Sequence, residues 1–170
     1  MRLVNDPSEL RNMAGRIKLL LMDCDGVLTD GRLYFSASGE ELKVFDVRDG
    51  QGIVSWHKAG FQSGIISGRD AGKIIERRVE ELGMHFRRVR SENKVKDLQQ
   101  IIAETRLSPR ETAYIGDDVG DIAVMKEVGL AIAVADAVEE ARVVAHFVTK
   151  ACGGRGAVRE VTDLLLTSQD

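Results

Sequence analysis

Two carboxylates follow the most apolar run of the sequence, Leu19-Leu20-Leu21-Met22-Asp23-Cys24-Asp25-Gly26-Val27. A short apolar run of this kind predicts a buried strand, and the glycine after it favours a turn. Residues two apart share one side of an extended chain, so Asp23 and Asp25 can face the same cleft. Like charges this close are costly unless a cation or a proton divides them. Taken alone, the pair is equally consistent with acidic residues that end a strand and cap the next turn.

Apolar patterns outside this stretch alternate between strands and helices. Strands are predicted at residues 17–22, 62–66, 112–115, 130–134 and 147–148. Helices are predicted at residues 50–59, 71–82, 95–105, 119–128, 138–143 and 157–166. This alternation predicts an α/β fold, a Rossmann-like doubly wound parallel sheet, with functional loops beyond the carboxyl ends of its strands.

The composition matches an ordinary soluble domain. With 170 residues, 44% hydrophobic and 30% charged, the chain is expected to form one domain over residues 1–170. A net charge of −3 without a basic face argues against nucleic-acid binding. No apolar run approaches the roughly 18 residues of a membrane span, and residues 1–9 lack a signal-like apolar stretch. We therefore expect a cytoplasmic protein that contacts no membrane.

One stretch, about residues 32–46, interrupts the alternation. Residues 32–36 and 40–46 predict two strands joined by Ala37-Ser38-Gly39, a tripeptide typical of a β-hairpin turn. Its apolar side chains are Leu33, Phe35, Leu42 and Val44. Because an isolated hairpin is marginally stable, these side chains need another surface, either this chain's own sheet or a neighbouring subunit.

A second acidic cluster, Gly116-Asp117-Asp118-Val119-Gly120-Asp121, also follows a predicted strand. Helix capping accounts for one of these aspartates or two. Capping does not readily account for three aspartates within five positions together with two more at the end of another predicted strand. Such a concentration of hard oxygen ligands suits Mg²⁺.

Two further segments offer groups that could bind an anion. Ser67-Gly68-Arg69 follows a third predicted strand, and Asn93-Lys94 opens a predicted helix. Ser67 is also a good N-cap, and an exposed lysine needs no special reason, so each segment alone has an ordinary structural interpretation.

Together these segments resemble the haloacid dehalogenase superfamily of phosphohydrolases. The closer likeness is to the 3-deoxy-D-manno-octulosonate 8-phosphate phosphatases of lipopolysaccharide precursor synthesis. The residues that carry it are 23–31, 45–50, 66–69, 116–118 and 153–160, and the last segment is the most specific. The resemblance implies a haloacid dehalogenase fold without a cap domain, because only the hairpin occupies the first place where relatives insert one.

The resemblance also implies roles for the site residues. Asp23 would attack phosphorus and become an aspartyl phosphate, while Asp25 would act as general acid and then general base. The Asp23 carboxylate, the Asp25 carbonyl and Asp117 would bind Mg²⁺. Ser67 and Lys94 would hold the phosphate oxygens. Asp118 and Asp121 would act without binding the metal directly, either through water or by orienting Lys94, and the resemblance does not rank the two.

Substrate recognition is assigned to arginines, again by resemblance. Arg69 and Arg78 could meet the carboxylate of a sugar acid, although Arg78 could equally lie on a solvated helix face. Arg155 could reach a neighbour's cleft or simply belong to the loop before the last helix. A homotetramer of the kind this family forms would supply the wall that a capless site lacks.

Two rival functions stay open. One is a phosphatase of the same chemistry that acts on another sugar-acid phosphate, such as a sialic-type nine-carbon sugar. The other is a non-catalytic tetramerisation module. The intact set of acidic and basic motif residues argues against the module, because a purely structural role needs none of them.

The remaining side chains of chemical interest are expected to be structural. His57, His85 and His146 are single and unclustered in the sequence. Cys24 points away from its flanking aspartates by strand alternation and is predicted to be buried in the core, as is Trp56.

Overall fold

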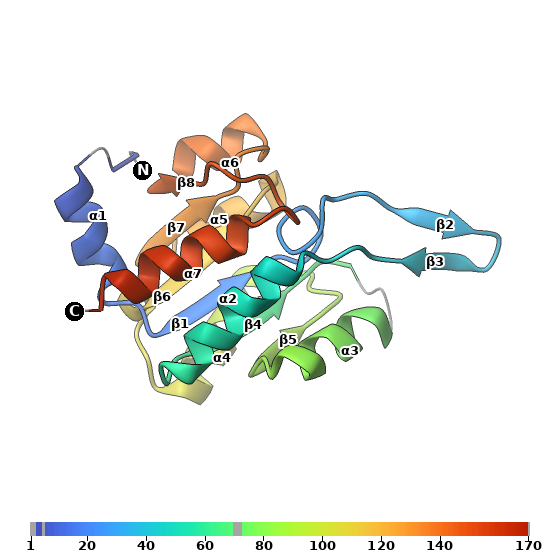
Figure 1. Ribbon diagram of the computed structural model, residues 1–170, viewed down its shortest axis with the longest axis horizontal. Helices are drawn as coiled ribbons and strands as arrows, with labels where there is room; N and C mark the ends of the chain where they lie inside the picture. Colours follow the sequence, from blue (N-terminus) through green and yellow to red (C-terminus); the bar gives the residue numbers. More distant parts are fainter. Residues whose placement is uncertain (1–2, 5, 70–72, 170) are drawn as a thin grey trace.

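The computed structural model describes residues 3–4, 6–69 and 73–169, and its centre is a parallel six-stranded sheet (Figure 1). The strands are β1 (Leu19–Met22), β4 (Gln62–Ile66), β5 (Phe86–Arg88), β6 (Thr112–Gly116), β7 (Leu130–Ala133) and β8 (Phe147–Val148). Their order is β5-β4-β1-β6-β7-β8, and every neighbouring pair is parallel. The predicted doubly wound sheet is confirmed, with β1 in its middle.

Helices cover both faces of the sheet. They are α1 (Pro7–Ala14), α2 (Val47–Lys58), α3 (Lys73–Leu82), α4 (Lys94–Thr105), α5 (Ile122–Met125), α6 (Glu139–Val144) and α7 (Ala157–Thr167). α2 and α7 lie side by side on one face, with α4 and α5 behind the sheet (Figure 1). The start predicted at residue 71 for α3 lies outside the described residues. None of the helices described is long and apolar enough to cross a bilayer.

The core lies between these layers. All four residues of β1 are buried, as a strand covered on both faces requires. Cys24 is buried as predicted. Trp56 is buried as well, stacks on Phe61 with ring centroids 4.2 Å apart, and donates from Nε1 to the Gln62 carbonyl at 2.8 Å. Its predicted packing role is therefore confirmed.

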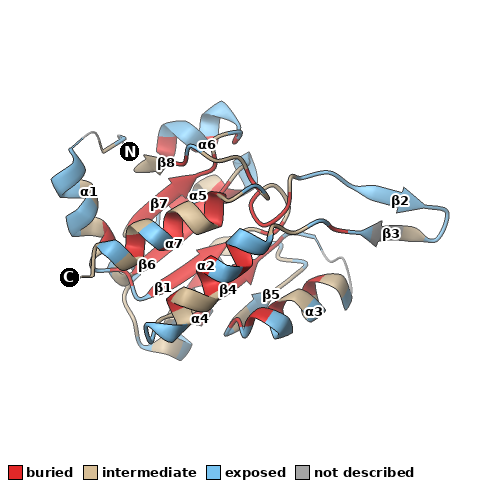
Figure 2. Cartoon of the chain, viewed as in Figure 1, coloured by how far each residue is buried: buried red, intermediate tan, exposed pale blue. Residues whose placement is uncertain are grey.

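The hairpin forms a separate antiparallel pair, β2 (Tyr34–Ser36) and β3 (Gly39–Leu42), that projects from the body (Figure 1). Figure 2 shows that most of this projection is exposed. Its apolar side chains Leu33, Phe35, Leu42 and Val44 are 42%, 63%, 51% and 52% exposed. Among the described residues, this chain's own sheet does not cover them.

Two predicted elements end elsewhere. The second hairpin strand was expected to reach residue 46, but Asp46 instead caps α2, with Oδ1 accepting the Arg48 N–H at 2.7 Å. Helix capping by an aspartate therefore outweighed strand alternation. The helix expected over residues 119–128 is a 3₁₀ turn, Val119–Asp121, followed by the short α5. Capping of that turn by Asp118 shapes its start.

Two of the histidines, which are far apart in the sequence, lie together in the fold. The rings of His57 and His85 meet edge to face, with centroids 4.9 Å apart. Both also contact Ser63, which lies on β4. The sequence does not indicate this pairing, because His57 on α2 and His85 before β5 are brought together by the fold around β4.

Candidate active site

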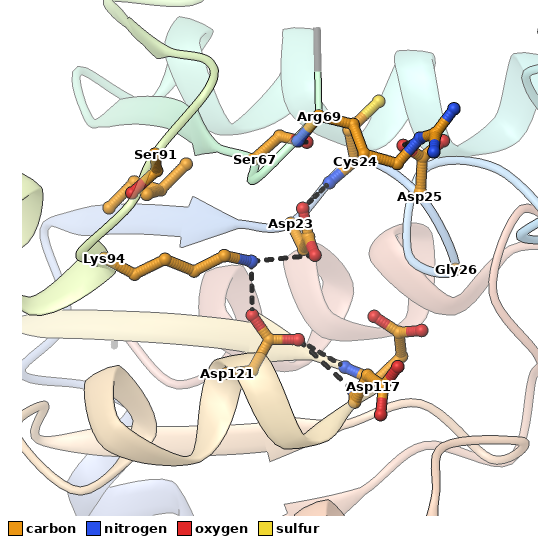
Figure 3. A network of polar contacts seen from close by, with 12 residues as sticks. Asp23, Cys24, Asp25, Gly26, Ser67, Arg69, Ser91, Lys94, Asp117 and Asp121 are labelled. Carbon is orange, nitrogen blue, oxygen red and sulfur yellow. Dashed lines mark hydrogen bonds and ion pairs between the residues drawn. The ribbon is translucent and has the colours of Figure 1, made fainter.

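The carboxyl ends of β1, β4 and β6 meet at one edge of the sheet and form a pocket of about 240 Å³. Figure 3 shows most of its side chains. The pocket is lined by Asp23, Asp25, Ser67, Gly68, Arg69, Lys94, Asp117, Asp118, Gly120 and Asp121. The structure thus brings together four segments that are far apart in the sequence, as expected for a parallel sheet of this strand order.

The Asp23 carboxylate is held at both oxygens. Oδ1 accepts the Cys24 N–H at 2.6 Å, and Oδ2 lies 2.8 Å from Lys94 Nζ (Figure 3). Burial raises the pKa of Asp23 to about 6, because Lys94 offsets burial and the repulsion of Asp121 only in part. The result is a fixed, partly desolvated carboxylate beside a cation, a suitable arrangement for a nucleophile.

Lys94 is positioned by the start of α4. Asn93 caps that helix, with Oδ1 accepting the Lys96 N–H at 3.0 Å. Lys94 Nζ lies 2.7 Å from Asp121 Oδ1, in addition to its contact with Asp23. Burial opposes the charge of Lys94, but the two carboxylates outweigh it and raise its pKa. Lys94 is therefore an ammonium directed into the pocket.

Tyr114 supports this network and was missed by the sequence analysis. The side chain is fully buried on β6, and its hydroxyl donates to Asp121 Oδ1 at 2.8 Å. Burial raises the pKa of Tyr114 well above its usual range, so the phenol stays neutral. The available signal was a tyrosine inside an apolar strand, since a buried hydroxyl needs a partner.

The acidic residues fit a divalent cation. Asp23, Asp117 and Asp121 each offer an oxygen within 4.8 Å of the others. Asp117 Oδ1 is buried and has no hydrogen-bond partner among the described residues. Burial, followed by the Asp121 and Asp23 carboxylates, raises the pKa of Asp117 to about 8. A bound cation would give Asp117 Oδ1 a partner and would reduce the repulsion among the three carboxylates. Oxygen ligands of this kind suit Mg²⁺.

Gly26 permits the approach of Asp117. Its φ is +88°, and a Cβ there would lie 2.0 Å from Asp117 Oδ2. A side chain at this position would push the Asp117 carboxylate away from the loop that carries Asp23. The position of Asp117 therefore requires a glycine at residue 26.

The structure separates Asp121 from Asp118, which the sequence left unranked. Asp121 is fully buried, and its Oδ2 accepts the N–H groups of Asp117 and Asp118 at 3.0 and 3.3 Å. Its Oδ1 is already held by Lys94 and Tyr114. Asp118 is exposed and caps the Val119 N–H at 2.7 Å. Asp121 is therefore placed to orient Lys94, whereas Asp118 shapes the loop.

Asp25 points toward Arg69 rather than toward Lys94 (Figure 3). Its Oδ2 lies 3.5 Å from Arg69 Nε, and its Oδ1 pairs with Lys43, a residue the sequence analysis did not identify. Ser67 is buried, and its Oγ accepts the Arg69 N–H at 3.3 Å. Ser67 therefore shapes the turn and also lines the pocket.

Arg78 does not line this pocket. It lies in a hollow of about 390 Å³ between the hairpin and α3, with its guanidinium carbon 5.2 Å from the Phe45 ring centroid. It also donates to the Asp46 carbonyl at 3.4 Å and to Glu81 at 3.0 Å. Its side chain is 13% exposed, so neither a solvated helix face nor a contact with this pocket describes Arg78 within the chain.

Arg155 lies on a loop, residues 153–156, that we call the glycine loop. The Arg155 side chain is 62% exposed and reaches Asp30 at 3.9 Å. Asp49 fixes the end of this loop, because its carboxylate accepts the N–H groups of Gly156 and Arg159 at 3.2 and 2.8 Å. Residues 45–50 and 153–160, which both carry the family likeness, therefore contact each other.

Known proteins are similar to this chain in sequence and in fold. Residues 89–158 match the haloacid dehalogenase-like hydrolase family. The 3-deoxy-D-manno-octulosonate 8-phosphate phosphatase of Yersinia pestis is 45% identical over 92% of this chain and 83% of its own length. The corresponding phosphatase of Escherichia coli strain K12 is also 45% identical, over 92% of this chain and 82% of its own length. The chain belongs to the 3-deoxy-D-manno-octulosonate 8-phosphate phosphatase family.

Solved structures of this phosphatase family superpose closely. The Yersinia pestis crystal structure has a TM-score of 0.93 at 43% identity, and covers 95% of this chain and 87% of the relative. The enzyme from Moraxella catarrhalis has a TM-score of 0.93 at 35% identity, over 96% of this chain and 94% of the relative. That structure is a complex with a magnesium ion, a phosphate ion and a KDO molecule.

Proposed function

We propose that this chain is a Mg²⁺-dependent phosphatase that hydrolyses 3-deoxy-D-manno-octulosonate 8-phosphate to the free sugar acid and phosphate. The observation that carries the proposal is the Asp23 carboxylate at the end of β1, held by Lys94 and faced by the unpartnered oxygen of Asp117. Family membership and the Mg²⁺, phosphate and KDO bound to the Moraxella catarrhalis relative support it.

In the first step, a carboxylate oxygen of Asp23 forms a bond to phosphorus as the bond to the sugar oxygen breaks. Asp25 gives its proton to the departing alkoxide, which leaves as a sugar hydroxyl. Lys94 and Ser67 hold phosphate oxygens, and the Lys94 ammonium offsets charge that accumulates around phosphorus. The product of this step is an aspartyl phosphate on Asp23. The contacts of Lys94 support its placement beside the reacting group.

In the second step, water attacks the aspartyl phosphate and Asp25 accepts its proton. The bond between Asp23 and phosphorus breaks, which releases phosphate and restores both carboxyl groups. The Asp23 carboxylate, the Asp25 carbonyl and Asp117 would hold Mg²⁺, which neutralises the repulsion between an anionic nucleophile and an anionic phosphate. Asp121 orients Lys94 in both steps.

Arg69 is the residue proposed to bind the carboxylate of the sugar acid. It lines the pocket, and its side chain is 45% exposed, so its guanidinium can reach a ligand. Arg78 and Arg155 are assigned to substrate less directly, since neither lines this pocket and each would need a neighbouring chain. A sialic-type nine-carbon substrate would use the same catalytic residues, so it is tested beside the eight-carbon one.

We also propose a single phosphatase domain over residues 1–170 that assembles as a homotetramer through the hairpin at about 32–46. The exposed apolar side chains of the hairpin support this assembly. The cytoplasmic location and the place in lipopolysaccharide precursor synthesis stay predictions.

The test is Mg²⁺-dependent phosphate release from both sugar phosphates by the native chain and by Asp23→Asn. The native chain should prefer the eight-carbon substrate and stop in excess chelator. Asp23→Asn removes the nucleophile at constant volume, so kcat should fall by at least about 10³-fold. Asp163→Asn, an exposed aspartate on α7, is the matched control and should keep full activity. Near-normal turnover by Asp23→Asn would exclude the covalent mechanism, and no turnover by the native chain would favour the non-catalytic module.

A further inference from the structure

Lys43 differs from its neighbours in the hairpin segment because its side chain is fully buried. Leu42 and Val44, on either side of it, are 51% and 52% exposed. Successive side chains of an extended segment point to opposite sides, so Lys43 faces the body of the protein while its apolar neighbours face outward. Burial of an ammonium is costly unless it is paired, which makes the partner of Lys43 informative.

One partner of Lys43 is Asp25. The pairing of Lys43 Nζ with Asp25 Oδ1 connects the hairpin segment directly to the acidic pocket. Asp25 Oδ2 is buried and has no hydrogen-bond partner among the described residues, although Arg69 Nε lies 3.5 Å away. Lys43 thus holds Oδ1 of the Asp25 carboxylate, whereas Oδ2 can still give or accept a proton.

Arg69 is less suited to this holding role. The proposed function assigns its guanidinium to the substrate carboxylate, and its side chain is 45% exposed. The side chain of Lys43 is fully buried. In the proposed reaction, Lys43 would therefore fix Asp25 while Arg69 binds the substrate.

We propose that Lys43 is a positioning residue that holds Asp25 in place for its proton transfers and so connects the hairpin to catalysis. This inference rests on the proposed function, since the position of Asp25 matters only if it transfers protons. Lys43 holds Oδ1 while Oδ2 gives its proton to the sugar oxygen as the P–O bond breaks. The same oxygen then accepts the proton of the attacking water, which restores the starting state.

The test compares two leaving groups in Lys43→Met, which removes the charge at similar length. A sugar alkoxide needs a proton in order to leave, whereas 4-nitrophenyl phosphate releases a stable anion that does not. Lys43→Met should lower kcat/KM for the octulosonate 8-phosphate by about 10²-fold, the usual size of general acid catalysis, and that for 4-nitrophenyl phosphate by only a few-fold. Lys18→Met, which removes an exposed lysine from its ion pair with Glu111, is the matched control and should change neither value.

Two further variants protect the test against misfolding. Lys43→Arg keeps the charge, so it should recover most of the alkyl phosphate activity, even if Lys43→Met is too unstable to assay. Asp25→Asn combined with Lys43→Met should be no slower than Asp25→Asn alone, because Lys43 acts through Asp25.

The possible failures are distinguishable. Equal losses on both substrates, or an additive double variant, would overturn the positioning role and leave the proposed function standing. A native chain that hydrolyses neither substrate with Mg²⁺ would overturn the proposed function and this inference with it.

Discussion

The hairpin and the glycine loop both touch the loop that follows β1, yet they are built in opposite ways. The hairpin reaches Asp25 through one buried side chain, Lys43, and exposes its apolar residues. The glycine loop packs with its backbone: the Gly154 N–H donates to the Val27 carbonyl at 2.8 Å, and the Gly153 N–H donates to Asp136 at 2.9 Å. The sequence allowed either segment to meet a neighbouring subunit.

The contrast indicates that the glycine loop contributes to the stability of the fold, as a scaffold, whereas the apolar side chains of the hairpin form an exposed surface. Close backbone packing leaves no room for side chains, so changes in the glycine loop should alter folding. Exposed apolar residues contribute little to the stability of one chain, so changes in the hairpin should alter association instead. Three predictions test this division, and a fourth concerns the acidic pocket.

The largest effect is expected from Gly153→Ala. A Cβ at this position would lie 1.7 Å from the Gly26 carbonyl oxygen, and backbone atoms cannot move aside as a flexible side chain can. The free energy of unfolding should fall by about 3 kcal/mol or more, and Tm by about 10 °C. Thermal and urea unfolding measure both. Gly120→Ala is the control, since a Cβ there meets no described atom within 4 Å, and it should change stability little. A stable Gly153→Ala would show that the glycine loop is not scaffold.

The next effect is on assembly. Phe35→Asp with Val44→Asp places charges at positions that are 63% and 52% exposed. The mass measured by light scattering should fall from tetramer to monomer, while circular dichroism of the dissociated chain should still show folded α/β structure. Activity should fall as well if, as proposed, an adjoining chain in the tetramer forms a wall of each site. A native chain that is monomeric and fully active at micromolar concentration would contradict the assembly proposal.

The acidic pocket at the carboxyl ends of β1, β4 and β6 should make the stability of the protein depend on pH, and bound Mg²⁺ should remove that dependence. Without metal, the pKa values of Asp23 and Asp117 are raised to about 6 and about 8. The folded chain therefore keeps protons that the unfolded chain, with carboxyl pKa values of about 4, has released. Stability from these groups is fully present below about pH 4 and is lost as pH rises through about 6 and then about 8.

Bound Mg²⁺ favours the ionised carboxylates, so the Tm increase caused by excess Mg²⁺ should grow between about pH 5 and about pH 8. Thermal unfolding with and without the metal gives this difference directly, and groups that titrate elsewhere cancel from it. Asp117→Asn should lose most of the increase. A metal effect that is independent of pH would count against the assignment of these two carboxylates.

The smallest effect is expected from Arg155→Ala. Its side chain is 62% exposed and its contact with Asp30 is long, at 3.9 Å, so stability should change by less than about 0.5 kcal/mol. If the glycine loop is scaffold alone, kcat/KM for the sugar phosphate should also stay within about twofold, whereas Arg69→Ala should lower it about tenfold or more. A loss in Arg155→Ala as large as that in Arg69→Ala would show that the glycine loop reads substrate in the assembled protein.

The sequence was sufficient for the elements that depend on local patterns. The apolar run of β1, the parallel sheet and the carboxylates at the strand ends follow from periodicity and from turn residues. The missed helix α1 also had a local signal: Asp6 accepts the Ser8 N–H at 2.8 Å, and Pro7 stands at the first position. An aspartate followed by a proline is a typical start signal of a helix, so α1 could have been predicted from the sequence.

The contacts of the glycine loop could not be read in this way. Asp49 caps α7 across 107 residues of sequence, and Arg48 donates to the Arg155 carbonyl over the same span. Each residue has an ordinary local interpretation, and nothing in the spacing pairs the two segments. Tyr114 and Asp121 illustrate the same limit, because the hydroxyl's partner is chosen by the turn that follows β6.

What the sequence determined, then, is the set of chemical groups and the strand ends that carry them, because alternation and turn chemistry act over a few residues. What the tertiary structure decided is which groups face inward. Alternation along residues 40–46 separates Lys43 from Leu42 and Val44 but does not say which side meets the protein. The apolar pair would ordinarily be assigned to the core. Here the fold buries Lys43 instead, because its ammonium pairs with the Asp25 carboxylate, which follows the end of β1.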